Sequence, residues 1–123
     1  MKRVLIVDDS VTMRRMVAAS LRQLGQVEFE DAGNGLEAIE RLALGSIDLI
    51  LLELNMPDMH GMEMIRFVQA HPTYRRIPII VLTTRTAEDS RSAALAAGAA
   101  LYMTKPFEPD TLAAQAKHLL NLD

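Results

Sequence analysis

The chain has 123 residues, half of them hydrophobic, which is the size of one domain with a substantial core. The net charge of -3, with no extended run of basic residues, argues against general binding to nucleic acid or to an anionic membrane. Cysteine is absent, which excludes a disulfide framework, a thiol nucleophile and a cysteine zinc site. The first hydrophobic run meets Asp8 and Asp9 after four residues, so it predicts neither a signal peptide nor a membrane span.

Short hydrophobic runs alternate with longer segments of helical periodicity along residues 1–123, which we expect to form a single domain. The predicted strands are residues 4–7, 27–32, 49–52, 79–82 and 100–103. The predicted helices are residues 11–24, a segment between Gly35 and Gly45, and residues 62–70, 87–97 and 110–120. Ser10 is a candidate N-cap, and Gly25, Gly45 and Gly98 are candidate helix ends.

Two of these helices have an expected inner face. Leu36, Ile39 and Leu42 share one side of the second helix, and Met62, Ile65 and Phe67 are the candidates in the third.

The strands are hydrophobic throughout instead of alternating with polar residues, which is typical of a parallel sheet covered on both faces. The predicted fold class is therefore α/β, a doubly wound five-stranded parallel sheet with five helices. In such folds, ligands bind beyond the carboxyl ends of the strands. A strand order of 2-1-3-4-5 would place the ends of the first, third, fourth and fifth strands side by side.

The central run, residues 49–52, is followed directly by Glu53 and a loop rich in proline and glycine. A carboxylate at the end of a buried strand is costly unless a cation or hydrogen bonds compensate for lost water. Taken alone, Glu53 would be an ordinary loop acid. Other strands, however, also end in polar residues, which favours a shared site.

The predicted strand ends carry three carboxylates, a hydroxyl and an ammonium, from Asp8, Asp9, Glu53, Thr83 and Lys105. Carboxylates this close repel one another, so we expect a bound cation or a protonated acid. Oxygen ligands without histidine or cysteine favour Mg²⁺. A metal, an ammonium and a hydroxyl around a carboxylate would stabilise the oxygens of a phosphoryl group.

Four short sequence segments lie at these predicted strand ends. They are VDDS at residues 7–10, NMPDMHG at residues 55–61, LTT at residues 82–84 and TKPF at residues 104–107. With them the chain resembles, over nearly its whole length, the receiver domain of two-component response regulators, which has a flavodoxin-like fold. The segment VDDSVTMRRMV and the lack of an output domain make it most similar to the single-domain chemotaxis, CheY-like, type.

The resemblance implies a role for each residue of the site. The implied metal-site residues are Asp8, Asp9, position 53 and Asn55, of which Asn55 lends a backbone carbonyl to Mg²⁺. Thr83 is the implied switch hydroxyl, and Lys105 pairs with phosphoryl oxygens. Tyr102 is the aromatic switch, whose inward or outward position reports activation. The peptide bond between Lys105 and Pro106 matches one that is commonly cis.

The resemblance also implies a cytoplasmic, monomeric signalling module without enzymatic activity of its own. Its expected partners are a sensor histidine kinase and a motor-switch or other target protein. The output surface is expected near the fourth helix, the fifth strand and the fifth helix.

The chain departs from the family pattern at the phospho-acceptor, which is aspartate in the family and Glu53 here. One extra methylene moves the carboxylate by about 1.5 Å, enough to impair in-line attack on a phosphate donor. We favour a native or introduced Asp-to-Glu replacement in an otherwise intact receiver. Three consequences remain open: a partial mimic of the phosphorylated state, a phosphorylation-deficient silent switch, or a pseudo-receiver regulated by binding alone.

Two other classes of function use a similar fold or similar residues. A metal-dependent phosphohydrolase also places aspartates at strand ends, but it needs an aspartate nucleophile and a cap that this length does not accommodate. A flavin-binding electron carrier shares the strand order, but its first loop would be rich in serine, threonine and glycine instead of Asp8 and Asp9.

Overall fold

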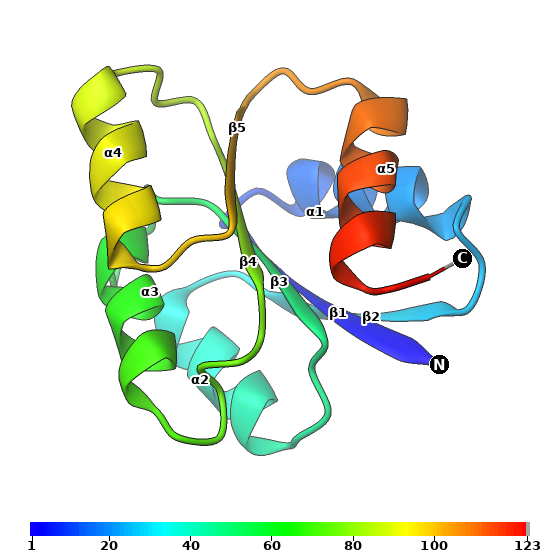
Figure 1. The fold of residues 1–123 in the computed structure, drawn as a ribbon, viewed down its shortest axis with the longest axis horizontal. Coiled ribbons are helices and arrows are strands. Elements are labelled where there is room, and N and C mark those ends of the chain that lie inside the picture. The colour runs from blue at the N-terminus through cyan, green and yellow to red at the C-terminus, as the bar shows by residue number, and fades with distance from the viewer. Residues whose placement is uncertain (123) are drawn as a thin grey trace.

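The computed structural model describes residues 1–122 and shows a five-stranded parallel sheet between two layers of helices (Figure 1). The strands are β1 (Lys2–Val7), β2 (Val27–Ala32), β3 (Leu49–Leu52), β4 (Ile79–Thr83) and β5 (Leu101–Thr104). Their order is β2-β1-β3-β4-β5, and every pair is parallel. The predicted fold class and strand order are confirmed.

The helices follow the strands in strict alternation. They are α1 (Val11–Arg22), α2 (Gly35–Ala43), α3 (Gly61–Ala70), α4 (Glu88–Ala97) and α5 (Pro109–Leu119). The first helix ends two residues before the predicted boundary, because the chain closes a turn there and then adopts positive φ at Gly25 (61°) and Gln26 (55°). The other predicted boundaries lie within one or two residues of those observed.

The central strands are buried on both faces. Every residue of β3 and β4 is buried, as their uninterrupted hydrophobic sequences predict. In the register of the sheet, Val7 pairs with Leu52, Leu52 with Val81, and Thr83 with Thr104. The carboxyl ends of β1, β3, β4 and β5 therefore reach the same edge of the sheet.

A hydrophobic cluster lies on each face of the sheet, between the sheet and the helices that cover that face. Helices α1 and α5 cover one face of the sheet, and α2, α3 and α4 cover the other (Figure 1). The buried hydrophobic residues of the helices in the first layer are Val17, Ala18, Leu21, Leu112, Ala113 and Ala116; those in the second are Ala38, Leu42, Met64, Ile65, Val68 and Ala94.

The predicted inner faces of two helices need correction. Leu36 is 61% exposed, and α2 packs through Ala38 and Leu42, one helical turn apart. Leu36 precedes Ala38 by two residues, which turns it by about 200° to the opposite side of the helix. In α3, Ile65 is buried as predicted, but Met62 and Phe67 lie only at the margin of the core, and Met64 and Val68 complete the inner face.

The start of α3 lies directly against the end of β3. The Gly61 N–H donates to the Leu54 carbonyl at 2.8 Å. A Cβ at Gly61 would lie 2.6 Å from the Leu54 Cα and 2.9 Å from the Glu53 carbonyl oxygen. This contact requires glycine, and it fixes α3 beside the backbone that carries Glu53.

Candidate functional site

The turn after β1 places Asp8 at the edge of the sheet. Asp8 as a whole residue is buried, at 4% exposure, and its Oδ1 accepts the Ser10 N–H at 2.9 Å. Ser10 in turn caps α1, since its Oγ accepts the Met13 N–H at 3.1 Å. The Arg14 Nη1 donates to the Asp8 carbonyl at 2.6 Å, which fastens this turn to α1. The neighbouring Asp9 is exposed.

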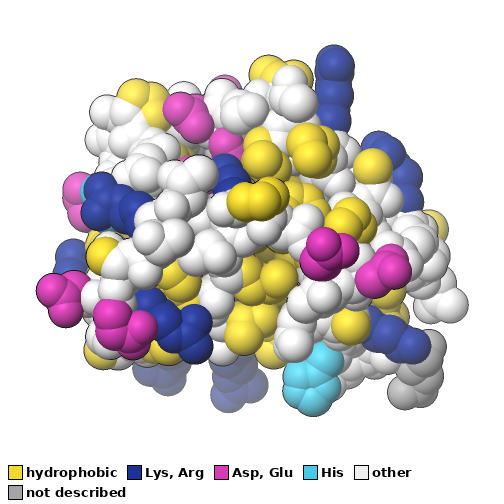
Figure 2. Space-filling view, turned by 90° about the horizontal axis from the view of Figure 1, so that it is seen from above, with side chains coloured by type: hydrophobic (Ala, Val, Ile, Leu, Met, Phe, Trp, Pro, Cys, Tyr) yellow, Lys and Arg dark blue, Asp and Glu magenta, His cyan; other side chains and the backbone are white. Residues whose placement is uncertain are grey.

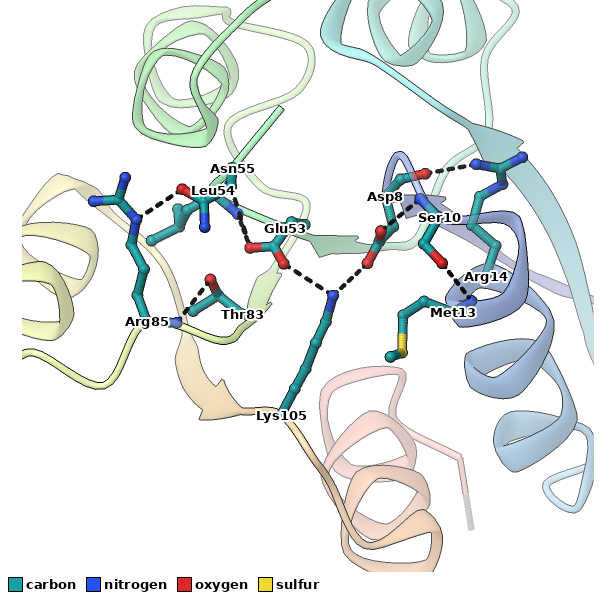
Figure 3. A network of polar contacts seen from close by, with 10 residues as sticks. All are labelled: Asp8, Ser10, Met13, Arg14, Glu53, Leu54, Asn55, Thr83, Arg85 and Lys105. Atoms are coloured by element: carbon teal, nitrogen blue, oxygen red, sulfur yellow. Dashed lines mark hydrogen bonds and ion pairs between the residues drawn. The ribbon is translucent and has the colours of Figure 1, made fainter. Parts of the chain in front are cut away.

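Glu53 follows β3 and is buried, at 5% exposure. Its Oε2 accepts the backbone N–H groups of Leu54 at 2.7 Å and Asn55 at 3.3 Å. Its Oε1 accepts a hydrogen bond from the Lys105 Nζ at 2.9 Å, and the same ammonium donates to the Asp8 Oδ2 at 2.7 Å (Figure 3). One cation thus bridges two buried carboxylates, which offsets the cost of removing them from water.

The electrostatics of this bridge favour the charged forms of Glu53 and Lys105. Burial raises the pKa of Glu53, but the Thr83 hydroxyl, the Lys105 ammonium and the Asn55 N–H outweigh it, and the net pKa lies below the ordinary value. For Lys105, burial lowers the pKa, but the two carboxylates of Asp8 and Glu53 raise it above the ordinary value. We conclude that Lys105 and Glu53 are both ionised at neutral pH.

The ends of β4 and β5 contribute a second set of contacts. Thr83 is fully buried, and its Oγ1 accepts the Arg85 N–H at 3.3 Å. Tyr102 is turned inward, at 6% exposure, and its hydroxyl donates to the Arg85 carbonyl at 2.8 Å. Burial raises the pKa of Tyr102 above its ordinary value, although the positive charge of Arg85 opposes this. The inward ring therefore has a partner for its hydroxyl.

The sequence prediction for the site covers the placement and the role of each residue, and the coordinates bear on placement alone. Asp8, Glu53, Thr83 and Lys105 converge at one edge, and the bond between Lys105 and Pro106 is cis. The prediction did not foresee how Asn55 uses its side chain: the Oδ1 accepts the Arg85 Nε at 2.8 Å (Figure 3). No pattern in the sequence pairs these two positions, because they are 30 residues apart on different loops.

Two further contacts around the site were also not predicted. His60 caps α3, with its Nδ1 accepting the Met62 N–H at 3.1 Å. Asp58 accepts the N–H groups of Gly35 at 3.0 Å and Leu36 at 3.1 Å, which holds the loop between β3 and α3 against the start of α2. These backbone hydrogen bonds keep the pKa of Asp58 below its ordinary value despite some desolvation.

The donor atoms at this edge are of the kind that Mg²⁺ prefers, namely carboxylate and carbonyl oxygens. Within residues 1–122 they do not form a preassembled group of three metal-binding side chains. The oxygens of Asp8 and Glu53 instead accept hydrogen bonds from Lys105 and from backbone N–H groups. Ligation of an ion by both acids would therefore require the lysine contacts to rearrange, whereas Asp9 is exposed to solvent.

The chain resembles known proteins over almost all of its length. The family model for the response regulator receiver domain matches residues 4–117. Chemotaxis protein CheY1 of Helicobacter pylori is 38% identical over 111 residues, which are 89% of this chain and 90% of that protein. The solved structure of chemotaxis response regulator CheY4 of Vibrio cholerae is 36% identical, with a TM-score of 0.88 over 97% of this chain and 98% of that one.

A third similarity concerns metal binding in the family. The Mn²⁺-bound form of response regulator Rcp1 is 28% identical and covers 98% of this chain and 95% of its own, with a TM-score of 0.87. The matched length, the strand order and the polar residues at the strand ends all agree. The chain belongs to the family of response regulator receiver domains.

Proposed function

We propose that this chain is a single-domain, chemotaxis-type response regulator that acts by binding a target protein. In this proposal Glu53 occupies the phospho-acceptor position, and its carboxylate partly replaces a phosphoryl group. The observation that carries the proposal is the contact between the Glu53 carboxylate and the Lys105 ammonium, at 2.9 Å, in a chain whose Tyr102 is turned inward.

The mimicry is partial for a physical reason. A phosphoryl group carries about -2 charge and three acceptor oxygens, whereas glutamate carries one charge and two oxygens. A shift of a switch from 1:99 to 99:1 needs about 5.5 kcal/mol of differential interaction. One carboxylate shared between Lys105 and backbone donors supplies only part of this. We therefore expect a population bias towards the active form, with Thr83 and Tyr102 as the switch residues.

The partners follow from the family and from the surface. CheY-type receivers interact with histidine kinases and downstream targets, so we propose a sensor kinase and a motor-switch or comparable protein as partners, met by a monomer in the cytoplasm. Within residues 1–122, no helix is long and hydrophobic enough to cross a membrane. Figure 2 shows hydrophobic side chains in the middle of one face, bordered by acidic and basic ones, a composition suited to protein contacts.

Mg²⁺ is the proposed cofactor, held by the acids Asp8, Asp9 and Glu53 and the backbone carbonyl of Asn55. A bound divalent ion supplies positive charge for oxygen anions at this edge. Lys105 carries one positive charge and contacts both Asp8 and Glu53, so it balances one of their two negative charges, and a bound ion would balance the remainder.

The test of the proposal is exposure to acetyl phosphate with Mg²⁺, followed by intact-mass measurement. We expect Glu53→Asp to gain a phosphoryl group, because the shorter carboxylate has the reach of the family's acceptor, and the parent chain to gain none at a comparable rate. Omission of Mg²⁺ should abolish the uptake by Glu53→Asp. Uptake by the parent chain at the rate of Glu53→Asp would contradict the assignment of Glu53 as a substitute for the phosphoryl group.

A further inference from the structure

Arg85 joins three separate parts of the site. Its backbone N–H donates to the Thr83 Oγ1 at 3.3 Å, and its carbonyl accepts the Tyr102 hydroxyl at 2.8 Å. Its side-chain Nε donates to the Asn55 Oδ1 at 2.8 Å (Figure 3). One residue of the loop between β4 and α4 thus contacts the end of β4, the buried ring of β5 and the loop that follows β3.

Asn55 connects this group of contacts to position 53. Its backbone N–H donates to the Glu53 Oε2 at 3.3 Å, while its side chain holds Arg85. A continuous series of hydrogen bonds therefore runs from Glu53 through Asn55 and Arg85 to Tyr102.

The loop between β4 and α4 has few other anchors. Residues 84–87 are all exposed. Ala87, the N-cap of α4, makes no side-chain cap hydrogen bond, and among the residues of this helix only Ala94 is buried. A segment with so little buried surface is held weakly by packing. The solvent-exposed hydrogen bond from the Arg85 side chain to Asn55 is therefore one of three hydrogen bonds through which Arg85 holds this loop, and it is the one that ties the loop to the segment after β3.

The position of this loop matters for Tyr102. A tyrosine hydroxyl that loses its acceptor inside the protein pays for desolvation without a hydrogen bond, so the ring is stable inside only while the Arg85 carbonyl remains in place. We propose that the Arg85–Asn55 hydrogen bond is a positioning contact that holds the loop between β4 and α4 and thereby keeps Tyr102 turned inward. The inference deepens the proposed function, since Tyr102 belongs to its switch.

The test measures the ionisation of Tyr102 in the 123-residue chain. The chain has two tyrosines, so a Tyr74→Phe background leaves Tyr102 as the only absorbing phenol in a spectrophotometric titration. Asn55→Ala removes the acceptor but keeps the charge of Arg85, and we expect the pKa of Tyr102 to fall towards its ordinary value as the ring becomes exposed. Asn55→Asp retains an acceptor oxygen and should keep the pKa at or above that of the background.

Two more variants complete the experiment. Asn121→Ala, at an exposed position near the end of α5, is the matched control and should leave the titration unchanged. Arg85→Met gives an independent reading: loss of its positive charge alone would raise the pKa of Tyr102, so a fall would show loss of burial. An unchanged titration in Asn55→Ala together with a rise in Arg85→Met would overturn the inference.

Glu53→Gln separates this inference from the proposed function. Loss of the Glu53 charge by itself lowers the pKa of Tyr102, so exposure of the ring is compared here by acrylamide quenching of its fluorescence in the Tyr74→Phe background. Increased quenching in Asn55→Ala but not in Glu53→Gln would support the positioning contact and contradict the role of Glu53. The opposite pattern would retain the role of Glu53 and overturn the positioning contact. An increase in both variants supports the complete series of hydrogen bonds, and an increase in neither refutes both.

Discussion

At the scale of single residues, the site depends on one ammonium placed between two buried acids. The side chain of Lys105 is 10% exposed, and those of Asp8 and Glu53 are each 6% exposed. Ion pairs in this environment are weakly screened by solvent, and removal of one member leaves uncompensated charge in the interior. Lys105 therefore has a structural role as well as its proposed signalling role.

Lys105→Met tests this structural role by urea unfolding at neutral pH. Breaking a buried ion pair by removing one partner costs about 3–5 kcal/mol, and we expect a loss of this order. The loss should shrink in acid, because protonation of Glu53 removes a negative charge that the lysine had balanced. Lys117→Met, at an exposed position on α5, is the matched control and should change stability little. Equal effects of both substitutions would contradict the structural role.

The pH dependence of stability follows from the direction of the pKa shifts. The pKa of Glu53 is lower in the folded chain, so its contribution is present above the unfolded value of about 4.3 and is lost as pH falls through the folded value. The pKa of Lys105 is higher in the folded chain, so its contribution is complete below about 10.4 and is lost as pH rises through the folded value.

Urea midpoints measured across the acidic range test the first of these contributions. Glu53→Gln carries no titrating group at this position, so we expect its stability to fall less steeply than that of the parent chain as the pH drops below about 4.3. Parallel curves for the two proteins would show that Glu53 is not stabilised in its charged form.

At the scale of elements, the site is positioned by contacts between helix starts and the loop after β3. Gly61 brings α3 against the backbone of Glu53 and Leu54, and Asp58 ties the same loop to the start of α2. Met59 packs over Gly35, where a Cβ would lie 2.5 Å from the Met59 Cβ. The loop that carries Asn55 is thus held from both sides.

Gly61→Ala tests the closest of these contacts. The new methyl group would meet backbone atoms at 2.6 and 2.9 Å that cannot move independently of β3, so we expect a loss of about 1–3 kcal/mol by chemical denaturation. Gly33→Ala is the matched control, since its methyl group would meet only side-chain ends of Glu37 at 3.3 Å and Arg14 at 3.4 Å. A neutral Gly61→Ala would show that α3 does not constrain the end of β3.

At the scale of the whole molecule, both helical layers stabilise one sheet. Helix α5 completes the layer with α1 through Leu112, Ala113 and Ala116, which are almost fully buried. Because the strands of the sheet are shared by the two layers, damage to one layer should lower the stability of the other. The expectation of one domain over residues 1–123 depends on this coupling.

Leu112→Ala tests the coupling between layers. Removal of a fully buried leucine side chain costs about 2–5 kcal/mol, and we expect the loss to appear in one transition, with far-UV circular dichroism and tyrosine fluorescence coincident. Leu44→Ala, at a position that is 77% exposed, should stay within about 0.5 kcal/mol of the parent chain. Separate transitions for the two probes would contradict a single cooperative unit.

The sequence by itself determined the class of fold and the composition of the site. The uninterrupted hydrophobic runs at β3 and β4 favour burial on both faces, which a parallel sheet between two helical layers provides. Polar residues directly after such strands must then meet at one edge. For this reason the sequence alone predicts that Asp8, Glu53, Thr83 and Lys105 are neighbours at one edge of the sheet.

Tertiary structure alone decided how these groups are used. The sequence does not reveal that one ammonium bridges Asp8 and Glu53, that Asn55 holds Arg85 through its side chain, or that Tyr102 is turned inward. It also misplaced Leu36, because hydrophobic spacing defines several possible faces of a short helix and only packing against the sheet selects one. Local pattern fixes which elements form, whereas hydrogen bonds between distant loops depend on three-dimensional distances that the linear order does not contain.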